Sequence, residues 1–254
     1  MLRSRIIPCL LIHKNGLVKT INFKDPKYVG DPINAVKIFN EKKVDEIMVL
    51  DIDASVQGNE PNYELISKLA NECRMPLCYG GGVKNTEQIK RIVELGVEKV
   101  SISSAACENP DLVSEASSIV GNQSVVVVAD VKKKLFREKY ELYTHNGNKR
   151  IEKDLFSFLK IMEDLGAGEI VINSIDRDGC MNGYDIKLIS RIKKNLKIPL
   201  TAIGGAGKIE DIELLINDLG TIGAAAGSLF VFKGKYRAVL INYPSFEEKD
   251  KINK

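Results

Sequence analysis

The amino-acid sequence is poor in the residues that build metal sites and disulfide frameworks. Only two histidines, His13 and His145, stand among its 254 residues. Its five cysteines are odd in number and contain no C-x-x-C pair, which argues against a zinc motif and against paired disulfides. Cys180 falls in a predicted loop with neither histidine near it in sequence, so we do not expect a catalytic thiol. We therefore expect no metal and no cofactor.

Long apolar runs and a strong charge imbalance are also missing. No apolar run is long enough to cross a bilayer, and a formal charge of +3 is close to neutral for this length. Composition thus gives no reason to expect a membrane or a nucleic acid as a partner. The chain starts directly with a predicted strand and without a signal-peptide pattern, so we expect a cytoplasmic protein. Its 44% apolar and 28% charged residues are typical of a soluble enzyme.

Short β-branched runs alternate along the chain with amphipathic stretches of helical length. This alternation is typical of βα units around a parallel sheet. Eight strands are predicted, over residues 5–12, 46–52, 76–81, 98–103, 124–131, 168–174, 198–204 and 221–227. Helices are predicted over residues 32–43, 61–73, 86–95, 109–119, 154–165, 185–196 and 208–218, with N-caps at Asp31, Asn85 and Asn109. A helix over 235–242 and a frayed tail over 246–254 complete the prediction.

Eight strands with helices outside close most simply as a single (β/α)8 barrel, the TIM barrel, spanning residues 1–254. A doubly wound open sheet is the alternative. One insertion interrupts the pattern over residues 133–152, where alternating residues surround Asn146-Gly147. Such a sequence predicts a hairpin on the loop after the fifth strand.

The two halves of the sequence repeat each other, which favours the closed barrel. A Met-Pro-Leu segment runs into three glycines in the first half, and Ile-Pro-Leu runs into two glycines in the second. The matched positions are Pro76 with Pro199, Gly81 with Gly204, Asp53 with Asp176 and, after one inserted residue, Ser103-Ser104 with Gly227-Ser228. Two four-strand halves of this kind would complete one barrel with a twofold internal repeat.

The glycine and serine pairs of this repeat predict phosphate binding. In (β/α)8 barrels the active site lies at the C-terminal ends of the strands, where backbone amides commonly hold phosphate. Glycines that merely ease tight turns are the alternative at any single position. Because both halves carry such pairs at one barrel mouth, we expect a ligand with a phosphate at each end. The predicted phosphate- and substrate-binding residues are Lys19, Gly81, Gly82, Ser103, Ser104, Asp176, Gly204, Gly205, Gly227 and Ser228.

Aspartates end several predicted strands at the same mouth. Asp130 follows the apolar run VVVVA and is the best candidate for an acid–base catalyst. For Asp51 and Asp178 we favour a structural role, in which the carboxylate accepts backbone N–H groups. Lys19 lies in a glycine-containing loop after the first strand, where it would either close over a phosphorylated substrate or face solvent.

The chain resembles, over nearly its whole length, the cyclase (synthase) subunit of imidazole glycerol phosphate synthase from histidine biosynthesis. The motifs that carry this resemblance are RIIPCL, GDP at 30–32, LDIDAS, GGG at 80–82, EKVSI, VVVAD, GAGEI, NSIDRDG, GYD at 183–185, GGAGK and AAGSLF. The resemblance implies a lyase that forms a heterodimer with a glutaminase. Ammonia from that partner would pass through the barrel to the mouth. There it would cleave and cyclise a doubly phosphorylated ribulosyl-formimino-carboxamide nucleotide, giving imidazole glycerol phosphate and aminoimidazole carboxamide ribotide.

The same resemblance implies a ring of alternating charges at the barrel floor, through which ammonia passes. The residues at the matching positions are Arg5, Glu46, Lys99 and Glu169, each at the start of a predicted strand. A salt-bridge cluster that only stabilises the barrel bottom is the alternative explanation. Since all four positions carry the expected sign of charge, we favour a retained ammonia route.

Two positions depart from the family pattern. Family enzymes have catalytic aspartates at the ends of the first and fifth strands, but this chain has Leu11 at the first and Asp130 at the fifth. Leucine cannot transfer a proton. The segment KGKYRAVLINYP also replaces the charged final helix of the family. These departures resemble a paralogous branch of the family that is found in gene clusters for bacterial surface polysaccharides. That resemblance implies that the chain supplies ammonia to a separate sugar amidotransferase, which makes an acetamidino group. A third possible function is that of an aminoaldose–ketose isomerase, from the sister family in histidine biosynthesis. That enzyme also needs an acid at the end of the first strand, where this chain has Leu11, and the floor charges fit the cyclase better.

Overall fold

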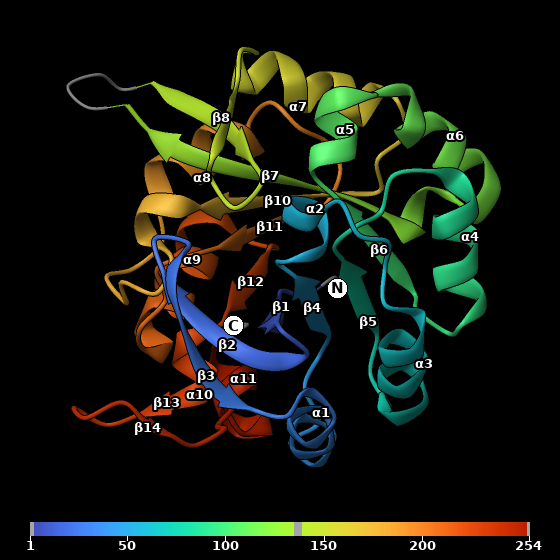
Figure 1. Cartoon of the computed structure of the whole chain (residues 1–254). Coiled ribbons are helices and arrows are strands. Elements are labelled where there is room, and N and C mark those ends of the chain that lie inside the picture. Colours follow the sequence, from blue (N-terminus) through green and yellow to red (C-terminus); the bar gives the residue numbers. More distant parts are fainter. Residues whose placement is uncertain (1–2, 135–138, 253–254) are drawn as a thin grey trace.

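The chain forms a closed barrel of parallel strands in a computed structural model that describes residues 3–134 and 139–252. The barrel strands are β1 (Arg5–His13), β4 (Ile47–Asp51), β5 (Leu77–Gly80), β6 (Lys99–Ile102), β7 (Val125–Lys133), β10 (Glu169–Ser174), β11 (Leu200–Ile203) and β12 (Gly223–Ala226). Each pairs in parallel with the next, and the β12–β1 and β7–β10 pairs close the ring (Figure 1). The predicted eight strands and (β/α)8 fold are confirmed.

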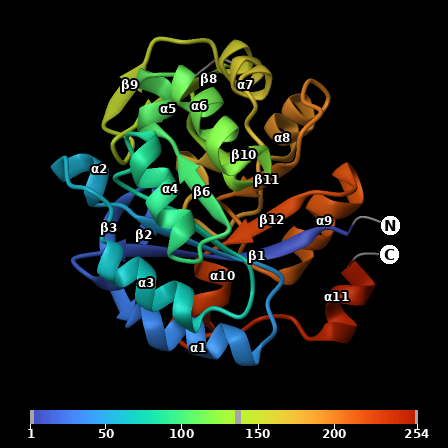
Figure 2. The same cartoon turned by 90° about the vertical axis from the view of Figure 1, so that its right-hand side faces the viewer.

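Amphipathic helices surround this ring. The longer ones are α1 (Pro32–Glu41), α3 (Tyr63–Glu72), α4 (Thr86–Glu94), α6 (Asp111–Val120), α7 (Leu155–Asp164), α8 (Ile186–Lys193) and α9 (Ile209–Leu219). The Asp31 and Asn85 side chains accept the predicted capping bonds. The cap predicted at Asn109 is wrong, because α6 begins after Pro110 without a side-chain cap. Figure 2 shows α1, α3 and α4 side by side on one flank of the barrel.

Two apolar layers hold the barrel together, one inside the ring and one between the strands and the helices. Alternation along each strand sends one set of side chains inward and the other outward. The inner layer consists of Ile7, Cys9, Met48, Cys78, Val126, Val128, Val171, Ile203 and Ala225, with Leu11 and Leu50 packed on it. The barrel interior is therefore a packed apolar column between floor and mouth.

The internal repeat is visible in the ring order. Strands β5 and β11 lie on opposite sides of the barrel, and so do β6 and β12. The latter two are followed by short helices that the sequence did not predict, α5 (Ser104–Glu108) and α10 (Ser228–Val231). The residues before these helices, Ser103 and Gly227, share a backbone conformation, with φ/ψ of −125°/−77° and −104°/−71°. A further short helix, α2 (Ala54–Gln57), follows β4.

Two hairpins extend from the mouth of the barrel. The first, which we call the strap, consists of β2 (Gly16–Ile21) and β3 (Lys24–Gly30), where the sequence predicted only a loop. The second consists of β8 (Tyr140–Thr144) and β9 (Lys149–Ile151), and it pairs with the end of β7. This second hairpin confirms the insertion predicted over 133–152, of which residues 135–138 lie outside the described range.

The C-terminal region differs from its prediction. Residues 235–242 do not form a helix, since β13 (Phe232–Lys233) and β14 (Ala238–Val239) make a small hairpin there. Gly234 and Arg237 both have positive φ, at 73° and 51°, and this excludes a continuous helix. The tail predicted to be frayed forms α11 (Phe246–Ile252), which buries Ile252 against the core; residues 253–254 lie outside the described range. Two single 3₁₀ turns are η1 (Asn122–Ser124) and η2 (Ile175–Arg177).

None of the helices within residues 3–134 and 139–252 is long and apolar enough to cross a membrane.

Candidate active site and barrel floor

A cavity opens at the mouth of the barrel, where the C-terminal ends of the strands converge. Ten of the residues named from the sequence line it together with Leu11: Lys19, Gly81, Gly82, Ser103, Ser104, Asp130, Gly204, Gly205, Gly227 and Ser228. The strap adds Thr20 and Phe23, and the tip of the second hairpin adds His145 and Asn146. The sequence did not predict these covering residues.

The glycines at the mouth are required by their backbone conformation. Gly81 and Gly205 have φ of +124° and +110°, which disfavours any residue with a side chain. A Cβ at Gly81 would lie 2.5 Å from the Asp51 carbonyl oxygen, and one at Gly205 would lie 2.1 Å from the Gly183 carbonyl oxygen. Tight turns thus explain these glycines by themselves, and the same turns bring bare backbone to the cavity wall, as phosphate binding needs.

Lys19 reaches from the strap into the cavity. Its side chain is buried, and Nζ donates a hydrogen bond to the Cys9 carbonyl oxygen at 2.5 Å. A Cβ at Gly227 would lie 2.6 Å from this Nζ, so the amine sits against the Gly227-Ser228 turn. Burial lowers the pKa of Lys19. The solvent-facing alternative for Lys19 is therefore wrong, and its amine stands where a phosphate on this turn would meet it.

Asp130 lies on β7 and has the properties of a proton-transfer group. Its neighbour across the ladder is Asn173 on β10, whose Nδ2 donates to the carboxylate at 2.9 Å. Burial raises the pKa of Asp130 to about 7, although the hydrogen bond from Asn173 acts in the opposite direction. A carboxyl that titrates near neutral pH can both take and return a proton during a reaction.

Leu11 stands at the same mouth on β1. It lines the cavity, and it packs on the apolar column of the barrel interior beside Leu50. Its backbone pairs with β4 on one side and with the strap on the other, in register with Leu50 and Val18. The side chain is thus held where the repeat would place a second acid, and it offers the cavity only methyl groups.

The other mouth aspartates have structural partners. Asp51 accepts the backbone N–H groups of Asp53 and Ala54 at 2.9 and 3.1 Å, and so caps α2. Asp178 accepts the Thr20 hydroxyl at 2.6 Å and the Phe23 N–H at 3.1 Å, which fastens the strap across the mouth. The structural roles favoured for these two aspartates are confirmed.

Asp176 lies beside the cavity rather than among the residues that line it. Its carboxylate accepts the backbone N–H of Lys133 at 2.7 Å, and this bond ties η2 to the end of β7. Its repeat partner Asp53 bonds the His13 ring at 2.7 Å and the Lys14 N–H at 2.8 Å. A substrate contact for Asp176 stays a prediction.

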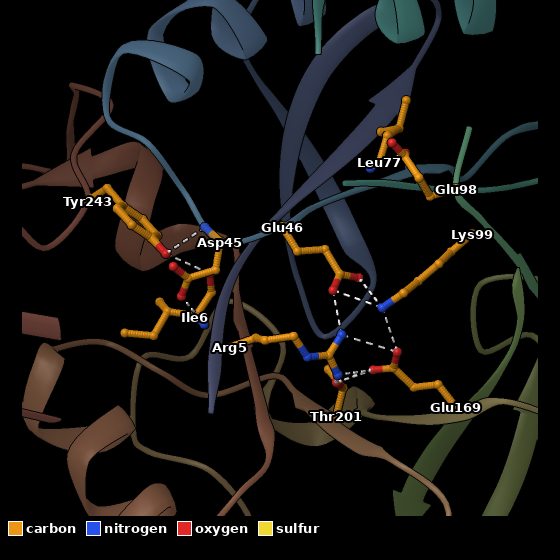
Figure 3. Close-up of polar contacts among 10 residues, drawn as sticks. All are labelled: Arg5, Ile6, Asp45, Glu46, Leu77, Glu98, Lys99, Glu169, Thr201 and Tyr243. Carbon is orange, nitrogen blue, oxygen red and sulfur yellow. Dashed lines mark hydrogen bonds and ion pairs between the residues drawn. The ribbon is translucent and has the colours of Figure 1, made fainter. Parts of the chain in front are cut away.

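At the opposite end of the barrel, four charged side chains form a ring, which we call the floor ring (Figure 3). Arg5 pairs with Glu46 and, at 2.8 Å, with Glu169. Lys99 bonds both carboxylates at 2.9 Å. Thr201 donates a further hydrogen bond to Glu169 at 2.5 Å. Charges therefore alternate around the ring, as the resemblance implied, and each carboxylate is held by both cations.

The ion pairs of the floor ring outweigh the desolvation of its members. Burial alone would lower the pKa values of Arg5 and Lys99 and raise that of Glu169. The mutual hydrogen bonds and charges reverse this, raising the pKa of both cations and lowering the pKa of Glu169 to about 2. Arg5, Lys99 and Glu169 are thus charged at neutral pH. This arrangement suits the stabilising role as well as the ammonia route.

Within residues 3–134 and 139–252, no three His, Cys, Asp or Glu side chains gather in a group that could hold a metal ion.

The geometry defines a (β/α)8 barrel with a covered cavity at its mouth and a ring of ion pairs at its floor. Comparison with known proteins places this barrel in a family. The profile of the family described as "Histidine biosynthesis protein" matches residues 5–237.

Named relatives match nearly the whole chain. A Vibrio vulnificus protein, provisionally named imidazole glycerol phosphate synthase subunit hisF3, is 59% identical over 99% of this chain and 96% of its own. A Pseudomonas aeruginosa protein with the provisional name hisF2 is 50% identical over 98% and 99%. The imidazole glycerol phosphate synthase subunit HisF of Lactococcus lactis is 41% identical over 91% and 89%. The chain belongs to the histidine biosynthesis family, and within it to the HisF-type subunits.

Proposed function

We propose that this chain is the cyclase-type subunit of a two-protein glutamine amidotransferase. It binds a glutaminase at the floor, and ammonia released there passes the floor ring and the apolar column to the mouth. The mouth holds a doubly phosphorylated ribulosyl-formimino-carboxamide nucleotide, with one phosphate near Gly81, Gly82, Ser103 and Ser104 and the other near Gly204, Gly205, Gly227 and Ser228. The subunit names of the relatives and the complete set of floor charges support this proposal.

The chemistry at the mouth would be that of a lyase that forms imidazole glycerol phosphate and aminoimidazole carboxamide ribotide. Asp130, with a pKa of about 7, is the proton-transfer group in this proposal. Lys19 meets the phosphate at the Gly227-Ser228 turn, because its buried amine lies beside that turn.

The rate of cyclisation that we expect follows from one observation: the floor ring is complete, but Leu11 occupies the position of an acid at the mouth. Loss of one general acid–base group typically costs roughly 10²–10⁴-fold in rate. We therefore propose that this subunit accepts ammonia as its relatives do but cyclises the nucleotide poorly.

The same observation favours a second function, in which the chain passes ammonia on instead of using it. In this case a separate sugar amidotransferase receives the nitrogen and makes an acetamidino group for a surface polysaccharide. The apolar Leu11 extends the apolar column up to the mouth. Because no acid stands at that position, ammonia that arrives there would not be protonated by it.

The test is to mix the purified chain with a glutaminase of the same family and to follow complex formation and glutamate release. The proposal predicts a stable complex and a faster release of glutamate than from the glutaminase alone. Leu214→Ala on the outer face of α9, where the side chain is 53% exposed, serves as a surface control. If the chain neither binds nor stimulates a glutaminase, both functions are wrong.

A further inference from the structure

The C-terminal segment that departs from the family pattern runs down to the barrel floor. After the β13–β14 hairpin, the backbone N–H groups of Leu240 and Asn242 bond the carbonyls of Val231 and Phe230. The segment then brings Tyr243 against β1, and its ring packs on Phe230 with the centroids 5.3 Å apart. Figure 2 shows α11 and the start of β1 at the same end of the molecule.

Tyr243 stands where the barrel wall lacks ladder pairs. The β1–β4 ladder begins at Cys9 and Met48, several residues above the floor. Below it, the Tyr243 hydroxyl donates to the Ile6 carbonyl oxygen at 2.8 Å and accepts the Asp45 backbone N–H at 3.2 Å. Side chains therefore join the two strands at the floor, in place of the backbone.

Asp45 completes this junction. Its carboxylate accepts the Ile6 N–H at 3.0 Å and pairs with Lys249 of α11 at 2.7 Å. Both polar backbone groups of the fully buried Ile6 are thus bonded by this cluster. The neighbours of Ile6 and Asp45 in the sequence are Arg5 and Glu46, two members of the floor ring. Figure 3 shows Tyr243 and Asp45 beside that half of the ring.

The other half of the ring is built differently. Lys99 and Glu169 lie in regular ladder pairs, with Cys78 and with Val126. Arg5 itself pairs with Gly223 on β12, so the difference is confined to the seam between β1 and β4. A carboxylate bridge is present there too, since Glu98 accepts the Leu77 N–H at 2.8 Å, but it adds to the ladder and does not replace it. The spacing of Arg5 and Glu46 therefore depends on the C-terminal segment in a way that the spacing of Lys99 and Glu169 does not.

We propose that Tyr243 is a positioning residue of the floor: through Ile6 and Asp45 it fixes Arg5 and Glu46 at the spacing that the ring requires. As far as it concerns ammonia entry, this inference rests on the function proposed above. Tyr243 touches neither substrate nor partner in this role. It acts by keeping the hydrogen bonds from Arg5 to Glu169 and Glu46 in place.

The test compares Tyr243→Phe, which keeps the aromatic ring and removes only the hydroxyl, with the control Tyr236→Phe. Tyr236 lies in the turn of the neighbouring hairpin and is 91% exposed. In the isolated chain, carboxyl NMR titration should show the pKa of Glu169 rising from about 2 toward the ordinary glutamate value in Tyr243→Phe alone. With a glutaminase, Tyr243→Phe should lower the stimulation about 5-fold, the factor equivalent to one net hydrogen bond.

Thermal unfolding of both variants controls for loss of folded protein. If Tyr243→Phe does not fold, Lys249→Met removes the ion pair to Asp45 from the outside and should move the Glu169 titration in the same direction. An unchanged Glu169 titration overturns the positioning role. If even the unaltered chain does not stimulate the glutaminase, the proposed function is wrong. The Glu169 titration then still decides the role of Tyr243.

Discussion

The floor and the mouth of this barrel keep their charged groups in opposite ways. At the floor, two cations and two carboxylates satisfy one another, and the Glu46 and Glu169 side chains are almost fully buried. At the mouth, Asp130 has only neutral donors, Asn173 and Ser103, and shares the cavity with an apolar Leu11. The floor ring therefore stabilises its charges, whereas the mouth holds a carboxyl with a raised pKa. Stabilised charges suit a fixed passage, and a carboxyl whose pKa is raised toward neutral pH suits proton transfer.

The largest stability effect is expected from breaking the floor. Glu169→Gln leaves Arg5 and Lys99 facing a single carboxylate, and removing one partner of a buried ion pair costs about 3–5 kcal/mol. Urea unfolding at neutral pH measures this loss, with the exposed Glu115→Gln on α6 as the control. Because the pKa of Glu169 is lowered, its contribution is complete above about 4.5 and is lost as pH falls toward 2. Equal stability of the two variants would contradict the account of the floor.

The mouth should respond to pH with the opposite sign. Burial raises the pKa of Asp130 from 3.8 to about 7, so ionising this carboxyl destabilises the folded chain as pH rises through that window. Asp130→Asn removes the titration. Its stability relative to the unaltered chain should therefore rise by roughly 4 kcal/mol between pH 4 and 8. Asp218→Asn, at an exposed position of α9, should show no such rise. A flat difference for Asp130→Asn would mean that the carboxyl is well solvated.

The smallest effect concerns the phosphate site. Ser228 is buried at the mouth and follows Gly227, which lies against the amine of Lys19; in the proposed function its hydroxyl is an added donor for phosphate. Ser228→Ala should raise the Kd of the proposed bisphosphate substrate about 10-fold, since hydrogen bonds to charged groups are worth about 1.5–3 kcal/mol. Calorimetric titration measures this change, and Ser118→Ala on α6 is the matched control. Unchanged binding by Ser228→Ala would remove this serine from the site.

Much of the barrel could be predicted from the sequence, because its signals are local. The β-branched runs predicted the strands, and the repeat of Gly81 and Gly204 favoured the closed barrel. The hairpin around Asn146-Gly147 was also visible, since its turn residues are specific. The ring at the floor, with its contacts of Arg5 and Lys99, was expected only through the resemblance to the cyclase family.

The missed elements depend on contacts between distant segments. The strap is ordered by Asp178, which lies far from it in sequence. The helix predicted over 235–242 contains no proline, and only the backbone conformation of Gly234 and Arg237 shows that it turns. The tail helix is the exception, because it begins with a local capping box in which Ser245 and Glu248 accept each other's backbone N–H groups. Periodicity within one segment carries none of this information.

The most direct test of the central claim is ammonium-dependent cyclisation by the unaltered chain, Leu11→Asp and Leu11→Asn. The assay needs no partner, because ammonium chloride supplies the nitrogen and imidazole glycerol phosphate is the measured product. The account predicts little product from the unaltered chain and from Leu11→Asn, and a gain of roughly 10²–10⁴-fold in Leu11→Asp. Efficient turnover by the unaltered chain would contradict it. Failure of all three proteins would equally show that the mouth differs from a working cyclase by more than this one acid.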